Sequence, residues 1–267
     1  MDKPAAADEV LYDLKDHIAT ITLNAPERMN TISGTMLKQL SELLLAADRD
    51  PEARCIILTG TGRAFCAGLD LRIQTSGMRQ QLATTTSTDI DLRNTPPTVL
   101  HALNTPVICA LNGGAAGYGA DTAIGCDIRI MAKSSKLALS FAKRGILPES
   151  GGTWLLPRLV GWEKAATLIF TGRTLAPDEC VAMGLASEVV PDAELMPRAR
   201  ALAAEIAANA PLAVQAAKRM MRMSYSETFD EHVHHVYLQL LALMRTEDSR
   251  EGMLSFVEKR PAVFKGR

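Results

Sequence analysis

Short, largely apolar runs constrain the fold of this chain more than any other feature. Three of them are residues 55–58 (Cys-Ile-Ile-Leu), 107–111 (Val-Ile-Cys-Ala-Leu) and 128–131 (Ile-Arg-Ile-Met). A run of this length is typical of a strand buried on both faces of a parallel sheet. Residues 18–23 alternate and predict another strand, and Val189-Val190 ends a further short one. Glycine-rich turns and helical stretches separate these strands, so the sequence predicts an α/β fold.

Helical periodicity occurs between and after the strands. Ser33 is predicted to cap a helix over residues 35–47. Ala, Leu and Met recur at helical spacing toward the C-terminus, so we divide the chain into a core at 1–194 and a helical region at 195–267. The apolar faces of that region need cover from the core or from another subunit. The polar, Thr-rich segment 73–97 is predicted to be either a mobile segment near a ligand site or a plain surface loop.

Charge and cysteine content exclude several kinds of partner. The 267 residues include 29 Lys and Arg against 30 Asp and Glu, a net charge of −1, so no overall basic field favours nucleic acid or an anionic membrane. The five cysteines lack the spacing of a metal site or redox pair, which predicts free thiols in a reducing compartment and no bound metal. We find no secretory signal and no apolar run of membrane-spanning length, and therefore expect a cytoplasmic protein.

Two glycine-rich turns each follow a predicted buried strand. The first lies within residues 58–71 and the second within residues 107–121. Glycine lets main chain come close to a neighbouring group, because it has no side chain in the way. Where such a turn opens a helix, unpaired N–H groups and the positive end of the helix dipole point toward one place.

The spacing of these glycines does not fit a nucleotide cradle. Phe65 occupies the third glycine position of a dinucleotide fingerprint in the first turn, and Thr122 occupies it in the second. The phosphate-binding pattern that ends in Gly-Lys-Ser/Thr does not occur. Each turn alone predicts a tight structural turn, whereas two of them after successive strands indicate a binding site.

The same turns resemble the signatures of a known family. The string from Ala64 to Leu71 (Ala-Phe-Cys-Ala-Gly-Leu-Asp-Leu) is similar to the first signature of the crotonase (enoyl-CoA hydratase/isomerase) family. Residues 112–127 resemble the second signature, and residues 145–153 (Gly-Ile-Leu-Pro-Glu-Ser-Gly-Gly-Thr) resemble the third. Further family motifs follow in order at residues 156–161, 171–173, 182–185, 189–190 and 256–264. The resemblance covers residues 10–265, nearly the whole chain.

This resemblance implies a spiral of ββα units, a C-terminal helical trimerisation region, and a homotrimer or homohexamer that acts on an acyl-CoA thioester. Its shared chemistry is an oxyanion hole, and motif position assigns the two N–H donors to Leu69 and Tyr118. Such a pair stabilises charge on the thioester oxygen when the α-carbon loses a proton, and one lost donor typically costs about 2.7–4 kcal/mol. Coenzyme A is then part of the substrate, and no separate cofactor is implied.

The resemblance also implies contacts to the CoA and acyl parts of the substrate. The residues at matching CoA-binding positions are Arg28, Ala64, Phe65, Ala67, Arg72, Phe256 and Lys259. Arg28 is equally well explained as solvated surface, whereas Phe256 and Lys259 reach CoA from a neighbouring subunit in some members. Tyr118 stands where the family usually has glycine, so its ring either narrows the acyl pocket or points into the core.

The carboxylates depart from the pattern of a family hydratase, which uses two glutamates on one water. Asp121 occupies the first position and is one methylene shorter, and Phe141 occupies the second and carries no proton. Glu149 matches the acid/base position of several isomerase members, although it also lies near a helix start, where negative charge is favourable. Asp121 is predicted either to assist as an acid or to bond to main chain. Walls made by Phe141 and Tyr118 would raise its pKa.

These residues favour an enoyl-CoA isomerase with Glu149 as the base. The second hypothesis is a hydratase that uses Asp121 and Glu149. Another crotonase reaction, such as C–C hydrolysis or ring-opening isomerisation, is the third, and a catalytically silent acyl-CoA binder is the fourth. The acyl chain is not specified by the sequence, and we expect segment 73–97 and Tyr118 to select it.

Overall fold

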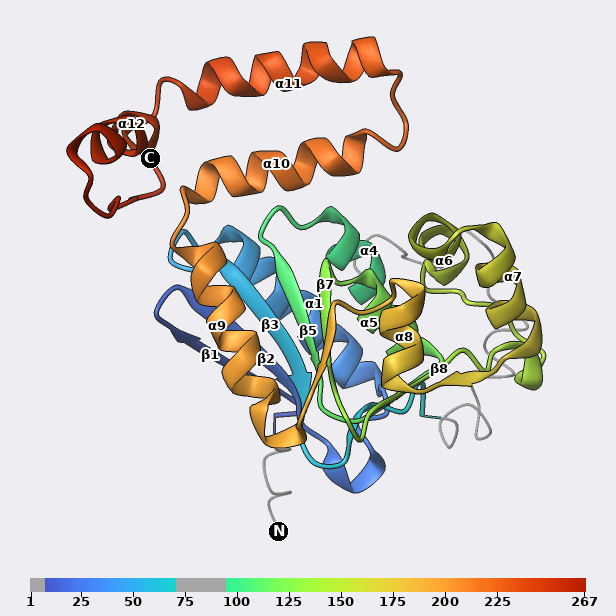
Figure 1. Cartoon of the computed structure of the whole chain (residues 1–267). Coiled ribbons are helices and arrows are strands. Elements are labelled where there is room, and N and C mark those ends of the chain that lie inside the picture. Colours follow the sequence, from blue (N-terminus) through green and yellow to red (C-terminus); the bar gives the residue numbers. More distant parts are fainter. Residues whose placement is uncertain (1–7, 71–94) are drawn as a thin grey trace.

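A six-stranded sheet forms the centre of the computed structural model, which describes residues 8–70 and 95–267 (Figure 1). Its strand order is β1-β2-β3-β5-β7-β10, and within it the β1–β2 pair is antiparallel whereas the pairs from β2 to β10 are parallel. The strands are β1 Val10–Lys15, β2 Ile18–Leu23, β3 Cys55–Gly60, β5 Val107–Leu111, β7 Ile128–Ala132 and β10 Glu188–Val190. Every strand that we predicted from the sequence is therefore present.

Strand β1 was not predicted, because most of its side chains are exposed and it carries little apolar pattern. It forms a hairpin with β2 through Asp16 and His17, whose φ angles are 52° and 63°. Two successive positive φ angles are the signature of a tight hairpin turn that usually contains Asn or Gly. The Asp-His sequence gives only a weak signal for such a turn.

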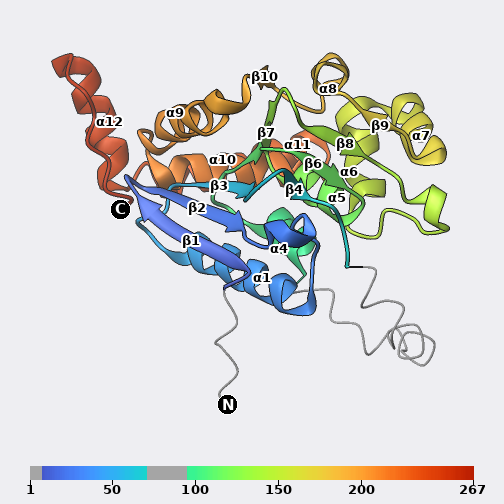
Figure 2. The same ribbon diagram turned by 90° about the horizontal axis from the view of Figure 1, so that it is seen from below.

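Helices cover both faces of this sheet. Alternate residues of β3 belong to different apolar clusters: Ile56 packs with the cluster that includes α1 Gly34–Arg49, and Ile57 packs with α9 Leu195–Ala207. Figure 2 shows α1 and α9 on opposite sides of the sheet. This arrangement explains the uninterrupted apolar runs, because both faces of each central strand are buried.

The cap of α1 confirms one sequence prediction directly. The Ser33 hydroxyl accepts a hydrogen bond from the Met36 N–H at 3.0 Å, and the helix extends over Gly34–Arg49 rather than 35–47. A side-chain acceptor at this position satisfies one of the N–H groups that a helix start leaves unpaired.

In a second, smaller sheet, three strands each follow a strand of the first sheet along the chain. Its order is β4-β6-β8-β9, with bounds Ala64–Cys66, Gly114–Ala116, Lys136–Ala138 and Thr174–Leu175. Strand β4 follows β3, β6 follows β5, and β8 follows β7, so each unit contributes one strand to each sheet. The helices that follow or connect these units are α4 Pro96–Ala102, α5 Tyr118–Gly125, α6 Gly152–Val160, α7 Trp162–Thr171 and α8 Pro177–Met183, with short 3-10 turns at Pro26–Arg28, Ala142–Arg144 and Asp192–Glu194. This repeated β-β-α order is the predicted α/β spiral.

The C-terminal helices leave this body. The predicted boundary at 194/195 coincides with the start of α9, but α9 still packs on the main sheet. Helices α10 Pro211–Met223 and α11 Phe229–Leu243 form an antiparallel hairpin beside the core, and α12 Glu247–Glu258 lies at its end (Figure 1). Helix α11 has no buried residue, although Phe229, which is 80% exposed, and several other side chains on it are apolar.

The described part of the chain contains no helix that is both long and apolar enough to cross a membrane. All five cysteines are free and buried, as the sequence predicted for thiols that pack in the core.

Arg129 is a buried cation that fixes the end of α5. Its side chain donates to the main-chain oxygens of Leu185 at 2.5 Å and Ile124 at 3.1 Å, and also to that of Cys126. Only 7% of Arg129 is exposed. A positive charge at the C-terminal end of a helix is favourable, because the last carbonyl groups there lack helical partners.

We expect Arg129→Met to destabilise the protein by about 3 kcal/mol, because several buried carbonyl groups lose a charged donor. Urea unfolding measures this difference in the free energy of unfolding. Arg200→Met on the exposed surface of α9 is the matched control and should leave the midpoint unchanged. Equal midpoints for the two variants would show that Arg129 contributes nothing to stability.

Candidate active site

The two glycine turns lie side by side because the strands that precede them are neighbours. Strands β3 and β5 pair in parallel, with Ile57 opposite Ile108, so both chains leave the sheet at the same edge. The Asn112 amide then ties the turns together. Its oxygen accepts from the Gly60 N–H at 3.1 Å, and its NH₂ group donates to the Gly62 carbonyl at 3.0 Å.

Asn30 supports the first turn from a third segment. Its NH₂ group donates to the carbonyls of Thr61 at 2.9 Å and Ala64 at 2.8 Å, and its oxygen accepts from the Ala25 N–H at 2.8 Å. The residue is fully buried and has a φ of 53°, a conformation that Asn tolerates better than most residues. We did not predict this role, since nothing in the local sequence links Asn30 to a turn some thirty residues away.

Main chain touches main chain where the turns meet. A Cβ atom on Gly119 would lie 2.2 Å from the Cys66 carbonyl oxygen, which is closer than any real contact. Gly68 has a φ of 102°, and a Cβ atom there would lie 2.9 Å from the Ala116 carbonyl oxygen and 3.8 Å from the Tyr118 nitrogen. Glycine is required at both positions, and the residues after Gly68 are thereby brought beside the start of α5.

The N–H groups of Leu69 and Tyr118 are both held at this junction. Around Leu69, the Ile32 N–H donates to the Gly68 carbonyl at 2.8 Å, and the Asp70 N–H donates to the Ile32 carbonyl at 3.1 Å. Tyr118 is the first residue of α5, where N–H groups lack helical partners. Within residues 8–70 and 95–267, neither of these two N–H groups donates to a main-chain carbonyl. Both are therefore available to an external acceptor.

One cavity contains most of the residues that we predicted for the chemistry. It has a volume of about 70 Å³ and is bordered by main chain from both turns and by side chains from the segment before α6. Its lining residues are Ala67, Gly68, Leu69, Ala116, Gly117, Tyr118, Ser140, Phe141, Arg144, Ile146 and Glu149. Ser140 and Arg144 were not predicted, because they belong to no motif that we used, and Ile146 lies in the third signature but was given no role.

The two candidate carboxylates have different environments. Glu149 lines the cavity and stays accessible to solvent, and partial burial raises its pKa. Asp121 is fully buried and is not among the residues that line the cavity. Its Oδ2 accepts from the Ser150 N–H at 3.2 Å, so it bonds to main chain of another segment.

The raised pKa that we predicted for Asp121 is confirmed. Burial, and then the nearby Glu149 carboxylate, raise the pKa of Asp121 to about 7, although the Ser150 and Gly152 N–H groups act in the opposite direction. Phe141 and Tyr118 are buried at 2% and 7% exposure and supply bulk around this part of the site.

The pKa of Asp121 predicts a specific pH dependence of stability. Its ordinary value is 3.8, so between that pH and about 7 the native carboxyl holds a proton that the unfolded one has lost. The associated stabilisation is complete at low pH and is lost as the pH rises through 7. We therefore expect the melting temperature of the wild type to fall relative to that of Asp121→Asn as the pH rises from about 5 to about 8. Parallel melting curves across this range would contradict the assignment.

The residues predicted to bind CoA are not all brought together. Ala64 and Phe65 lie in β4 beside the first turn, and Ala67 borders the cavity. The Arg28 guanidinium is paired with Glu9 at 2.5 Å, and Arg28 is therefore not a free cation. Arg72 lies outside the described residues, as does most of the 73–97 segment.

Phe256 and Lys259 lie far from the cavity of their own chain. Both are at the end of α12, which Figures 1 and 2 place at the opposite side of the molecule from α6 and α7. Phe256 is 85% exposed. Neither residue lines the cavity of its own chain, and their contact with CoA stays a prediction.

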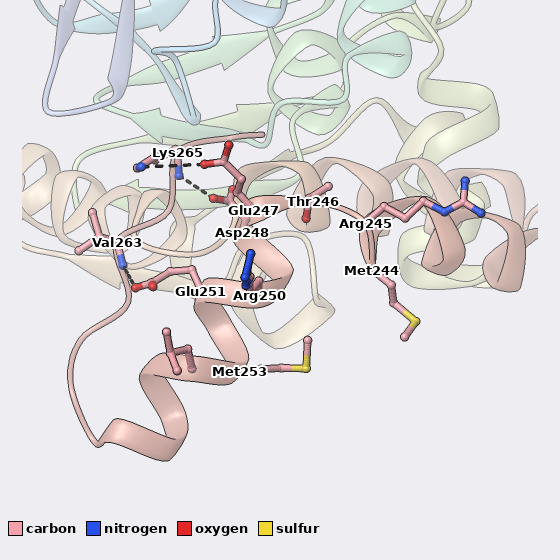
Figure 3. A pocket seen from close by; sticks show the side chains of 11 residues that line it. Met244, Arg245, Thr246, Glu247, Asp248, Arg250, Glu251, Met253, Val263 and Lys265 are labelled. Carbon is pink, nitrogen blue, oxygen red and sulfur yellow. Dashed lines mark hydrogen bonds and ion pairs between the residues drawn. The ribbon is translucent and has the colours of Figure 1, made fainter.

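A larger hollow of about 640 Å³ lies among these C-terminal helices (Figure 3), and none of its lining residues belongs to the two turns. Ion pairs and hydrogen bonds between α12 and the last residues form one of its walls, including one from the Lys265 N–H to Asp248 at 2.7 Å and one from the Val263 N–H to Glu251 at 2.8 Å. We assign no chemistry to this hollow, since it contains neither of the candidate N–H donors.

Comparison with known proteins defines the class to which this fold and site belong. The enoyl-CoA hydratase/isomerase family model matches residues 13–267. The chain therefore belongs to the enoyl-CoA hydratase/isomerase family, within the crotonase superfamily, which confirms the resemblance seen in its motifs.

Particular relatives extend over almost the whole chain. YngF of Bacillus subtilis strain 168, which carries a provisional enoyl-CoA hydratase/isomerase name, is 38% identical over 97% of this chain and 99% of its own. The 1,2-epoxyphenylacetyl-CoA isomerase of Escherichia coli K12 is 37% identical over 97% and 98%, respectively. A crystal structure of enoyl-CoA hydratase from Bacillus anthracis matches with a TM-score of 0.89 and 33% identity, over 97% of this chain and 100% of that chain.

Proposed function

We propose that this protein shifts the double bond of an unsaturated acyl-CoA, with Glu149 as the acid/base. One observation supports this function above all: Glu149 shares a cavity with Leu69 and Tyr118, whose N–H groups have no main-chain acceptor among the described residues. A carboxylate and two convergent donors are the parts that enolate chemistry requires.

The proposed reaction balances with one base. The thioester oxygen accepts hydrogen bonds from Leu69 and Tyr118, which lowers the energy of the charge that develops there. Glu149 takes a proton from one carbon of the acyl chain, and the electron pair delocalises toward the thioester as a dienolate. Glu149 then returns a proton to a different carbon of the conjugated system, and the double bond has moved. Coenzyme A takes part only as the thioester of the substrate, and the step calls for no other cofactor.

The position of Asp121 supports an isomerase over a hydratase. A hydratase of this family would need a second carboxylate on the water that adds to the acyl group. Asp121 is completely buried and does not line the cavity, and Phe141 stands where the other hydratase glutamate would be. The alternative is a hydratase that uses Asp121 and Glu149. Relatives that are named hydratases support it, including (E)-benzylidenesuccinyl-CoA hydratase of Thauera aromatica at 33% identity.

Purified protein should be assayed with matched 3-enoyl and 2-enoyl thioesters, with NMR to follow the products. We expect migration of the double bond without addition of water. Water addition without migration would favour the hydratase. An arm with 1,2-epoxyphenylacetyl-CoA tests ring-opening isomerisation, the reaction in the name of the Escherichia coli relative. CoA binding without any turnover would identify a silent acyl-CoA binder.

We also propose that the protein assembles as a homotrimer or homohexamer through its C-terminal helices. The support is the exposed apolar surface of α11, a helix with no buried residue of its own, together with the distance of Phe256 and Lys259 from the cavity. Sedimentation equilibrium gives the mass directly. Phe229→Glu on α11 should lower it toward that of one chain, and a monomeric wild type would refute the proposal.

A further inference from the structure

Arg144 brings a positive charge to the cavity that contains Leu69 and Tyr118. Among the described residues that line this cavity, Arg144 alone is positively charged and Glu149 alone is negatively charged. Within residues 8–70 and 95–267, no Asp or Glu, Glu149 included, forms an ion pair with the Arg144 guanidinium. Most exposed arginines need no partner, because water solvates them. Arg144 differs from these because it lines a cavity that the substrate is proposed to fill.

A tight turn and the preceding serine hold this side chain in place. In the 3-10 turn Ala142–Arg144, the Arg144 N–H donates to the Phe141 carbonyl at 2.8 Å, and Gly145 follows with a φ of 70°. Nη1 of Arg144 then donates to the Ser140 hydroxyl at 2.5 Å and to the Ser140 carbonyl at 3.1 Å. Two bonds to one residue that also lines the cavity keep the guanidinium at the cavity wall.

Most hydrogen-bond donors of this guanidinium have no acceptor. An arginine side chain has five N–H donors, which are distributed over Nε, Nη1 and Nη2. In the described parts of the chain only Nη1 has acceptors, and both are neutral oxygens of Ser140. A carboxylate binds such a planar group through two parallel hydrogen bonds. The Ser140 hydroxyl accepts from Arg144, so its own proton is also available to an anion.

Phe141 connects this wall to the proposed thioester site. It follows Ser140 in the chain, and a Cβ atom on Gly117 would lie 4.0 Å from the Phe141 ring. Gly117 directly precedes Tyr118, whose N–H is one of the two candidate donors. The guanidinium therefore bonds to the residue next to the one whose ring faces the oxyanion turn. The acyl group of a thioester held at that turn has this wall beside it.

We infer that the acyl group of the substrate carries a second carboxyl group, and that Arg144 binds this carboxylate together with the Ser140 hydroxyl. A neutral acyl group in the cavity would displace water from a guanidinium that has no acidic partner, which is unfavourable. A carboxylate replaces those lost hydrogen bonds with charge-assisted ones. The guanidinium also offsets the repulsion between this carboxylate and Glu149. The inference rests on the proposed function in where it puts the thioester.

The phosphates of CoA are the other anionic groups of such a substrate. The long pantetheine arm separates them from the thioester. Arg144, in contrast, shares a cavity of about 70 Å³ with the two candidate thioester donors and with Glu149. We therefore assign the guanidinium to the acyl group.

Titration calorimetry with saturated thioesters tests this assignment, because these ligands have no double bond to move. The probes are mono-CoA thioesters of straight-chain diacids with four, six and eight carbons, each compared with the thioester whose far end is a carboxamide. The carboxamide has the same shape as the carboxylate and no charge. We expect the best-fitting carboxylate to bind about tenfold tighter than its carboxamide, near the lower end for hydrogen bonds to charged groups, since Arg144 also contacts water. Arg144→Met should reduce this ratio to about one, and Arg144→Glu should invert it.

Lys143→Met is the matched control. Lys143 is in the same 3-10 turn, is also exposed and does not line the cavity. Its replacement removes one positive charge and should leave the ratio at the wild-type value. Equal wild-type affinities for carboxylate and carboxamide at all three lengths overturn the inference. An equal loss of both affinities in Arg144→Met, with the ratio kept, also overturns it and assigns the guanidinium to the CoA phosphates.

A reactive probe separates this inference from the proposed function. In the mono-CoA thioester of hex-3-enedioic acid, double-bond migration moves one proton from the α-carbon to the γ-carbon, and NMR follows it. Migration without any carboxylate preference in the calorimetry overturns the role of Arg144 and leaves the isomerase standing. An Arg144-dependent preference without migration of this probe or of uncharged 3-enoyl thioesters overturns the isomerase and supports the carboxylate site.

Discussion

Replacing Glu149 with glutamine is expected to lower kcat/KM for double-bond migration by about 10²- to 10⁴-fold, because the amide cannot accept the proton from the acyl chain. Glutamine has nearly the same shape as glutamate, so the cavity and the two N–H donors should be preserved. A kinetic assay with a 3-enoyl thioester gives the rate, and titration calorimetry with a saturated acyl-CoA gives the affinity. We expect the rate to fall and the affinity to remain within a few-fold.

Glu163→Gln provides the matched control for this substitution. Glu163 is an exposed residue in the first turn of α7 and does not line the cavity. Its replacement also removes one negative charge, so it reports any effect of net charge alone. If Glu149→Gln turned over substrate as fast as Glu163→Gln, Glu149 would not be the base.

The second large effect is expected for Gly119→Ala. The new methyl group would lie 2.2 Å from the Cys66 carbonyl oxygen, and neither partner is a flexible side chain. The turns must therefore move apart, and the proposed convergence of the Leu69 and Tyr118 N–H groups on one oxygen would be lost. The loss of one oxyanion-hole donor typically costs about 10²- to 10³-fold in kcat. We expect a loss of at least this size together with lower thermal stability.

Gly125→Ala separates this geometric effect from the general effect of a methyl group on α5. A Cβ atom on Gly125 would lie 3.5 Å from the Leu100 side chain, which is ordinary van der Waals contact. This control should keep the wild-type rate. Normal activity in Gly119→Ala would mean that the two turns need not touch, and it would remove the basis of the proposed oxyanion hole.

The elements of the fold could be predicted where the sequence carries a local physical signal. The buried strands were visible as apolar runs, and the start of α1 was visible as Ser33 before an apolar helical pattern. Strand β1 was missed, because its side chains are mostly exposed and its hairpin uses Asp16 and His17 instead of glycine. A local apolar pattern indicates that a segment is buried, but a strand at an exposed edge of the sheet has no such pattern.

The site was harder to predict because its residues meet only through the fold. The motifs named Leu69, Tyr118 and Glu149, and the structure places all three around one cavity. They could not show that Asp121 lies behind the cavity wall or that Ser150 bonds to it, since these facts depend on how α5 and α6 pack. Asn30 and Arg129 were missed for the same reason, as each acts on main chain of distant segments.

Strands β3 and β5 lie in the interior of the sheet, and their hydrogen-bond register sets the relative positions of the two turns that contain the candidate N–H donors. No side chain supplies either donor, so a mutation at position 69 or 118 changes the wall of the pocket and leaves an N–H group in place. Side chains at the candidate positions 121, 141 and 149 can therefore change one at a time while the two proposed carbonyl-binding N–H groups stay in place. A scaffold with this property can acquire new reactions without first losing the main-chain donors proposed to bind the thioester.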